Sequence, residues 1–204
     1  MTAMPRPSRA HHRRGELVAA ARRAVLDRGV LDLRLRDVAS QAEMSTGSVL
    51  YYFPTLGDLL HEVQRDAVER FCVCREEAAR REPDPRRKLV GTIRAGLPTG
   101  RDDELSVLLY ELGAYARRTP AYAAQHIRLY ERQAGLYTAI LETGAATGVF
   151  DLTRDAAAIA RGLVALEDGL GLHITQAVPT FTPAEAESML IGYAADATRC
   201  DLEV

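Results

Sequence analysis

Residue types that support catalysis or metal binding are scattered along this chain. The five histidines are scattered over four segments, and the three cysteines, Cys72, Cys74 and Cys200, show neither CxxC nor Cys/His ligand spacing. No GxSxG, HExxH or phosphate-binding glycine loop is present. The adjacent acids Glu167 and Asp168 would point in different directions on a helix. We therefore expect no enzymatic activity, no metal site and no cofactor.

A second group of residues has the chemistry to bind nucleic acid. Guanidinium, hydroxyl and phenol groups donate hydrogen bonds to phosphates and base edges, and a glycine near a helix N-terminus lets a duplex backbone approach closely. Such groups lie close together on two short expected helices that are joined by a tight turn. The residues predicted to face DNA are Arg36, Thr46, Gly47, Ser48 and Tyr51.

A third group combines aromatic rings with polar side chains at helical spacing. A cavity lined by aromatic residues and a few polar groups is the usual form of a small-molecule site. The alternative is that these residues are ordinary core or subunit-contact residues. Acidic side chains at 111, 167 and 168 would favour a cationic ligand if they are buried beside the rings. The candidate pocket residues are Phe71, Tyr110, Glu111, Tyr115, Tyr122, His126, Tyr130, Gln133 and Glu167.

The elements that position these groups all have helical periodicity, and no segment alternates with period 2. We expect an all-α fold of about nine helices, with an N-terminal three-helix helix-turn-helix domain and a C-terminal helical domain, to which the family resemblance described below assigns ligand binding and dimerisation. Three domains or segments are predicted: a flexible basic arm (1–12), a DNA-binding domain (13–60, its last helix continuing to about 81) and a body (61–204). The expected helices are 13–28, 34–42, 45–52, 55–81, 86–97, 103–118, 121–147, 154–177 and 184–200.

Charge is distributed unevenly along the chain. Residues 1–53 carry nine arginines and five acids, a net charge of +4, so the rest of the chain carries −6 against a total of −2. This asymmetry is typical of a nucleic-acid-binding head on an acidic body. No stretch approaches the roughly 20 apolar residues that cross a bilayer, and no secretory signal is readable, so we expect a cytoplasmic protein without membrane contact.

Residues 33–60, LRLRDVASQAEMSTGSVLYYFPTLGDLL, resemble the helix-turn-helix signature of the tetracycline-repressor (TetR) family. The order D-V-A, A-x-x-S-x-G, Y-Y-F-P and Leu-Leu carries the resemblance, which covers roughly residues 13–71 by motif. The resemblance implies that Ser45 joins Thr46, Gly47, Ser48 and Tyr51 near the DNA. It also implies that Thr55 caps the next helix and lies against a DNA phosphate. Tyr52 is a secondary candidate for DNA contact and is expected to be mainly structural.

The chain departs from the family pattern at four places. Glu43 stands where a glycine is common in the turn, and Arg34 stands where a threonine often caps the preceding helix. Leu50 replaces a usual tyrosine, and the Leu56-Gly57 pair replaces a usual lysine. The first departure predicts a left-handed backbone at a residue with a side chain. The last two remove customary phosphate contacts.

The resemblance further implies a homodimer in which the last two long helices of each chain pair in a four-helix interface. Small residues at 162, 169 and 171 permit close helix approach. The two recognition helices would then lie about one turn of DNA apart and read a near-palindromic operator. The candidate interface residues are Leu163, Leu166, Leu170, Ile174, Leu190 and Tyr193.

Together these patterns predict a DNA-binding transcriptional regulator, and the resemblance implies that it is a repressor. Its partners would be double-stranded operator DNA, a second copy of the chain and an unknown small-molecule effector that releases it from the operator. The alternative is a helical ligand-binding protein of the same fold that does not use DNA.

Overall fold

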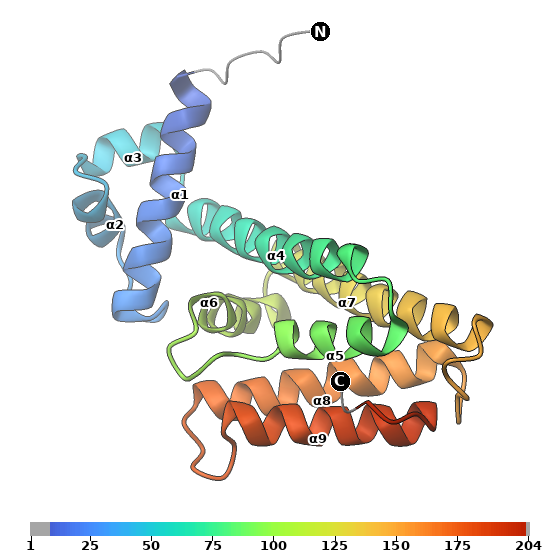
Figure 1. The fold of residues 1–204 in the computed structure, drawn as a ribbon. Helices are drawn as coiled ribbons and strands as arrows, with labels where there is room; N and C mark the ends of the chain where they lie inside the picture. Colours follow the sequence, from blue (N-terminus) through green and yellow to red (C-terminus); the bar gives the residue numbers. More distant parts are fainter. Residues whose placement is uncertain (1–8, 203–204) are drawn as a thin grey trace, which may run out of the picture.

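The computed structural model describes residues 9–202, and within that range the secondary structure is entirely helical. This confirms the all-α prediction (Figure 1). A 3-10 helix, η1, directly follows α6, so the single helix expected over 103–118 is in fact two elements. The elements are α1 (Arg9–Arg28), α2 (Leu35–Gln41), α3 (Thr46–Tyr52), α4 (Leu56–Arg81), α5 (Pro85–Gly96), α6 (Glu104–Gly113), η1 (Ala114–Arg117), α7 (Pro120–Ala146), α8 (Ala156–Thr175) and α9 (Pro183–Thr198).

The expected flexible arm is corrected in part by the start of α1. This helix begins at Arg9, so residues 9–12 are helical. They continue the periodic segment that follows them, and on it the carboxylate of Glu16 lies 3.2 Å from His12 Nε2. The rest of the predicted arm, residues 1–8, lies outside the described residues.

Helix starts are fixed by short polar side chains. The hydroxyl of Ser45 accepts a hydrogen bond from the backbone N–H of Ser48, and Thr55 and Asp58 form a reciprocal capping box at the start of α4. Arg34, which stands at the start of α2, gives no such cap, and its own N–H is bound by Asp37 Oδ2 at 2.9 Å. These hydrogen bonds mark the starts of α2, α3 and α4.

Two hydrophobic cores are joined by α4. One contains residues of α1, α2, α3 and the first half of α4, together with Leu108, Leu112 and Tyr122 from the body. The other contains residues of α5, α7, α8 and α9. The helix α4 is continuous from one core to the other, so it connects the body to the helix-turn-helix.

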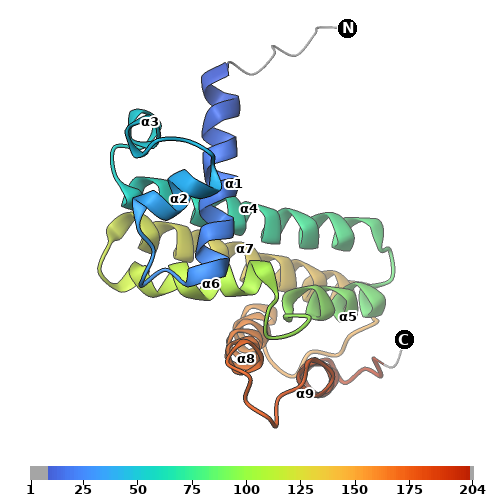
Figure 2. The ribbon, with the colours of Figure 1, turned by 90° about the vertical axis from the view of Figure 1, so that its left-hand side faces the viewer.

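The last two helices form the bottom layer of the molecule. Figures 1 and 2 show α8 and α9 side by side, with α5 and α7 above them and no helix on their lower side. Among the described residues, no helix is long and apolar enough to span a membrane.

Candidate DNA-binding surface and ligand pocket

The short helix α3 is anchored on one side and open to solvent on the other. Val49 and Phe53 are buried in the N-terminal core. On the other side Tyr51 is 83% exposed and Leu50 is 43% exposed. A tight turn joins α2 to α3, and such a pair with an exposed second helix is the geometry that places a helix in the major groove.

The predicted DNA-contacting residues gather at this end of the molecule. Ser45 Oγ lies 3.1 Å from the N–H of Ser48 and 2.9 Å from its hydroxyl, so these two residues organise the start of α3. Thr55 Oγ1 accepts from the N–H of Asp58 at 3.1 Å and donates to its carboxylate at 2.8 Å. Tyr52 is half-buried and meets Tyr51 edge-on at 5.1 Å between ring centroids. The remaining candidates, Arg36, Thr46 and Gly47, are exposed.

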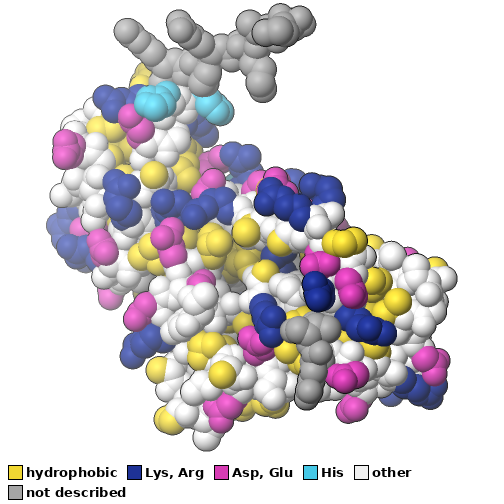
Figure 3. Space-filling model, in the orientation of Figure 1, with side chains coloured by type: hydrophobic (Ala, Val, Ile, Leu, Met, Phe, Trp, Pro, Cys, Tyr) yellow, Lys and Arg dark blue, Asp and Glu magenta, His cyan; other side chains and the backbone are white. Residues whose placement is uncertain are grey.

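Arg14 is a positioning residue that the sequence pattern did not reveal. Its Nη1 donates to the backbone carbonyl of Tyr52 at 2.6 Å, and its guanidinium lies 4.2 Å from the centroid of the Phe53 ring. It therefore ties α1 to the end of α3. The partners are 38 residues apart, so only the folded structure brings them together. Figure 3 shows histidine and basic side chains gathered over the adjacent end of α1.

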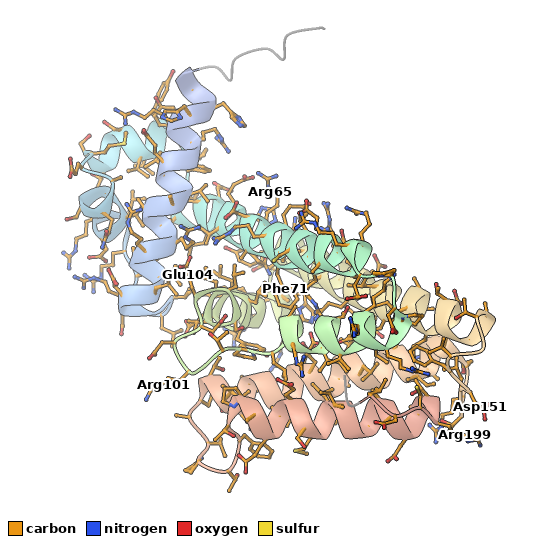
Figure 4. The ribbon with its side chains drawn as sticks, viewed as in Figure 1. Arg65, Phe71, Arg101, Glu104, Asp151 and Arg199 are labelled. Atoms are coloured by element: carbon orange, nitrogen blue, oxygen red, sulfur yellow. The ribbon has the colours of Figure 1, made fainter. Side chains whose placement is uncertain are left out.

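A cavity of about 320 Å³ lies in the body, between the second half of α4 and helices α5 to α8. Five of the nine candidate pocket residues line it: Phe71, Tyr110, His126, Gln133 and Glu167. Leucines from α6, α7 and α8 and the carboxylate-bearing Asp168 complete much of the wall. Burial, followed by the neighbouring charge of Asp168, raises the pKa of the Tyr110 phenol well above its usual value. Figure 4 marks Phe71 on α4 between the two ends of the molecule.

The other four candidate pocket residues lie elsewhere, which corrects the sequence prediction. The Glu111 carboxylate accepts a hydrogen bond from the N–H of Val30 at 3.1 Å, outside the cavity. Tyr122 donates to the carbonyl of Gly57 at 3.0 Å and packs with Tyr115 in the N-terminal core. Tyr130 is 39% exposed. Helical spacing placed Tyr122, His126 and Tyr130 on one side of α7, but different neighbours cover that side along its length.

Glu167, which lines the cavity, is one half of a buried ion pair. Arg75 and Glu167 are each 2% exposed, and two hydrogen bonds of 2.7 and 2.9 Å join the guanidinium to the carboxylate. Tyr137 and Gln133 also donate to this carboxylate, at 2.6 and 3.0 Å. Burial alone would lower the pKa of Arg75, but the charges of Glu167 and Tyr137 outweigh it and raise that pKa. The pair therefore joins α4 to α8 as a charged unit, in which both carboxylate oxygens and both terminal guanidinium nitrogens are hydrogen-bonded while Arg75 Nε is buried without a partner.

The sequence analysis assigned no role to Arg75. A single arginine in a charged stretch of α4 gives no signal in the sequence that its side chain is buried. In the part of the chain that the structure describes, no group of three or more His, Cys, Asp or Glu side chains is placed to hold a metal ion.

The candidate dimer residues are largely used within one chain, which is a second correction. Leu163, Leu170, Ile174 and Leu190 are buried in the C-terminal core, and Leu166 and Tyr193 are partly buried against it. On α9, Met189 is instead 51% exposed. The apolar stripe on α8 identified the face that packs on α7, because a core and a dimer interface produce the same helical pattern.

A helix-turn-helix with an exposed second helix, joined by one long helix to a body that holds a cavity, defines a one-component transcription regulator. Two family models match this chain. One, bacterial regulatory proteins of the tetR family, matches residues 17–63, and the other, the C-terminal domain of BetI-type transcriptional repressors, matches residues 85–198. The chain belongs to the TetR family and is a DNA-binding repressor of the BetI type, without enzymatic activity.

Individual relatives agree with this assignment. The chain is 27% identical over 173 residues to the HTH-type transcriptional regulator PksA of Bacillus subtilis, which covers 83% of this chain and 82% of PksA. It is also 27% identical over 145 residues to the HTH-type transcriptional repressor KstR2 of Mycolicibacterium smegmatis, covering 71% of this chain and 70% of KstR2.

Solved structures share the whole fold. A TetR transcription regulator from Haloarcula marismortui is 25% identical with a TM-score of 0.83, over 91% of this chain and 98% of that one. A transcriptional regulator from Saccharomonospora viridis, crystallised in complex with choline, has a TM-score of 0.83 at 24% identity, over 89% of this chain and 95% of that one.

Proposed function

We propose that this repressor reads its operator with α3 and leaves it when a small molecule occupies the cavity between α4 and α8. The observation that carries the proposal is that one continuous helix, α4, runs from the helix-turn-helix domain to the cavity. The helix α4 begins directly after α3 and reaches the cavity at Phe71, and one turn later Arg75 pairs with the cavity residue Glu167.

Base and phosphate contacts are assigned to the exposed side of α3 and its flanks. Tyr51 and Thr46 project from this side, while the hydroxyls at 45 and 48 hold the start of the helix in shape. Arg36 on α2 supplies positive charge beside them. Leu50 offers an apolar contact, such as a thymine methyl group, in place of a phosphate hydrogen bond.

A homodimer is assigned to the outer side of α8 and α9. The exposed residues of these helices include Met189 and the small residues Ala165 and Gly192, which allow two copies to approach closely. A two-fold dimer presents two copies of α3 and reads a near-palindromic operator.

Coupling between the sites is assigned to α6 as well as α4. Tyr110 on α6 lines the cavity, and the next residue, Glu111, holds the N–H of Val30 in the loop before α2. At the start of α6, Glu104 pairs with Arg22 of α1 at 2.9 Å, and Figure 4 shows it between the two helices. A ligand that displaces α6 therefore moves the DNA-binding domain.

The proposal is tested by fluorescence anisotropy on DNA from the upstream region of the gene, with a scrambled duplex for comparison. We expect tight binding to the native fragment only, two chains per duplex, and a log–log salt slope of about −4 or steeper. Choline is the first compound to add, because the Saccharomonospora viridis relative was crystallised with it. An effector lowers operator affinity in proportion to its preference for the released conformation.

The assignment of α3 is tested with the double variant Thr46→Ala/Tyr51→Ala. We expect at least a tenfold loss of operator affinity with an unchanged oligomeric state. The matched control is Thr180→Ala/Tyr130→Ala, which removes the same two residue types from exposed positions on the body. Retention of operator binding by the first variant would show that α3 is not the reading helix. Equal binding to native and scrambled DNA would contradict sequence-specific repression through this fragment.

A further inference from the structure

The helix proposed to read the operator, α3, carries an unusual set of side chains. Its seven residues include no arginine, lysine, aspartate, glutamate, asparagine or glutamine. Arginine or lysine reads guanine by paired hydrogen bonds, asparagine or glutamine reads adenine in the same way, and acidic side chains accept from cytosine. None of these contacts can come from α3, so this helix must discriminate between base pairs by other means.

The hydroxyl groups of α3 and its N-cap add little discrimination. The hydroxyl oxygens of Ser45 and Ser48 lie 2.9 Å apart and bond to one another, which holds the start of the helix in shape. Thr46 and Tyr51 carry the other hydroxyls of the exposed face. A hydroxyl both donates and accepts, so it can bond to more than one kind of base edge. Hydrogen bonds from α3 therefore support binding more than they select a sequence.

Leu50 is the aliphatic side chain of this exposed face. It is 43% exposed, whereas Val49 and Phe53 are 0% and 1% exposed and belong to the N-terminal core, whose described members do not include Leu50. The free chain therefore gains little packing from a leucine at this position. Against a polar base edge, Leu50 would displace water without replacing its hydrogen bonds, which is unfavourable. An apolar group of the DNA is the partner that this side chain fits.

Gly47 lies one turn before Leu50 on the same face of α3. A Cβ atom at this position would meet Ser45 Oγ at 3.9 Å, which is an ordinary contact distance. Its φ is not positive, unlike those of Gly29 and Gly148. Neither packing nor backbone geometry requires a glycine here, although glycine lowers helix stability relative to alanine. The space beside Leu50 is therefore open to a group of the DNA.

The apolar group that base pairs present in the major groove is the C5-methyl group of a pyrimidine. We propose that α3 reads this methyl group in each operator half-site, with Leu50 packed against it and Gly47 leaving room for close approach of the base. This inference rests on the proposed function, since it names the base chemistry that α3 recognises. Thymine and 5-methylcytosine carry the same methyl group at the same ring position, so both are sources of it. Methylation of a cytosine at this position then strengthens operator binding.

The test removes methyl groups from the native upstream fragment without changing its hydrogen-bonding groups. Each symmetry-related pair of thymines is replaced in turn by deoxyuridine, and binding is measured by fluorescence anisotropy. We expect at least one such replacement to lower the affinity of the wild type at least fivefold. Leu50→Ala should bind the native fragment more weakly and should bind the thymine and deoxyuridine forms of that pair within twofold of each other. Leu31→Ala, at a leucine that is 93% exposed in the loop before α2, is the matched control and should keep the wild-type ratio.

Gly47→Ala tests the close approach separately from Leu50. Alanine favours a helix over glycine, so this variant should unfold at the same temperature as the wild type or higher. Its added methyl group occupies the space assigned to the pyrimidine methyl. We expect its affinity to fall more on the thymine fragment than on the deoxyuridine fragment, which reduces the ratio between them at least twofold.

A second arm distinguishes the two sources of the methyl group. At the sensitive pair of positions, each T·A base pair is replaced by C·G, with the cytosine either unmodified or methylated at C5. We expect the wild type to bind the 5-methylcytosine form at least threefold more tightly than the cytosine form, and Leu50→Ala to bind both forms equally. Equal binding of both forms by the wild type would overturn the extension to methylated cytosine.

Two results would overturn the proposal as a whole. One is a wild-type affinity that no deoxyuridine replacement lowers, and the other is a wild-type ratio of thymine to deoxyuridine binding in Leu50→Ala. The proposed function fails in a different experiment, in which the wild type binds native and scrambled DNA equally. Tight binding to the native fragment without dependence on its methyl groups would therefore contradict this inference alone.

Discussion

At the scale of single residues, Glu43 shows how a departure from the family pattern is accommodated. It has φ of 53°, in the left-handed region, at the turn between α2 and α3. The backbone is kept there by hydrogen bonds from Glu43 N–H to the carbonyl of Ser40 and from Met44 N–H to that of Ala39, at 3.2 and 2.9 Å. Its exposed side chain contributes no packing in return. The turn therefore retains local strain.

Glu43→Gly should relieve this strain and raise the free energy of unfolding by about 1 kcal/mol, because glycine adopts positive φ without a steric cost. Urea denaturation at fixed protein concentration measures it. Glu131→Gly, an exposed position within α7, is the matched control and should lower stability by about 1 kcal/mol. A loss of stability in Glu43→Gly would mean that the side chain or the stiffer chain matters more than the strained backbone.

The features of the candidate sites that could be predicted from the sequence are those that depend on residues near one another in the chain. Ser45 and Thr55 cap their helices as their positions indicated, and Tyr51 is exposed where the spacing placed it. These features depend on contacts within one helical turn. Arg14 and Arg75 act through partners 38 and 92 residues away. Spacing within a helix carries no information about such partners, so neither could be assigned from the sequence.

At the scale of elements, helical periodicity indicated which face of each helix is apolar but not what covers it. The stripe of Leu163, Leu170 and Ile174 on α8 was assigned to a partner chain and is covered instead by helices of its own chain. The break after Gly113 has a similar origin, since the pattern of residues 103–118 continues through it. The number and order of helices were predictable because proline and glycine mark most of their ends.

The contact between α4 and α8 depends on one buried ion pair. Glu167→Gln should lower the free energy of unfolding by about 3 to 5 kcal/mol, because it leaves the charged guanidinium of Arg75 buried without a counter-charge. Chemical denaturation followed by circular dichroism measures the loss. A second ion pair between an arginine and a carboxylate, Arg199 with Asp151, lies at the surface of the body, where both side chains are largely exposed (Figure 4).

That exposed pair provides the control, since Asp151→Asn should cost less than about 1 kcal/mol. The double variant Arg75→Met/Glu167→Met should be less destabilised than Glu167→Gln, because it removes both buried charges together. If Glu167→Gln were as stable as Asp151→Asn, the ion pair would not be what joins α4 to α8.

At the scale of the whole molecule, α6 lies between the cavity and the DNA-binding domain. Tyr110 faces the cavity, and the adjacent Glu111 binds the N–H of Val30 at 3.1 Å in the loop that leads to α2. The loop begins at Gly29, which follows the last residue of α1 and has a positive φ of 71°. A Cβ atom at this position would lie 3.8 Å from the Glu111 carboxylate. One turn of α6 thus contacts both sites.

Glu111→Ala should uncouple the two sites without destroying either of them. With a saturating small molecule that releases the wild type from its operator, the ratio of operator dissociation constants with and without ligand should fall at least threefold. Operator affinity without ligand and ligand affinity without DNA should each stay within twofold. Because coupling is reciprocal, the effect of operator DNA on ligand affinity should fall by the same factor. Anisotropy and calorimetry on the same preparations give both ratios.

Glu111→Gln keeps an oxygen that can accept from Val30 and should retain the wild-type ratio, which separates the hydrogen bond from the charge. Glu131→Ala, an exposed glutamate on α7, should also behave as the wild type. A wild-type ratio in Glu111→Ala would exclude this contact as the route and leave α4, with its buried Arg75, as the connection between ligand and operator. Loss of coupling in Glu111→Ala alone would show that the loop before α2 transmits the occupancy of the cavity to the helix that reads DNA.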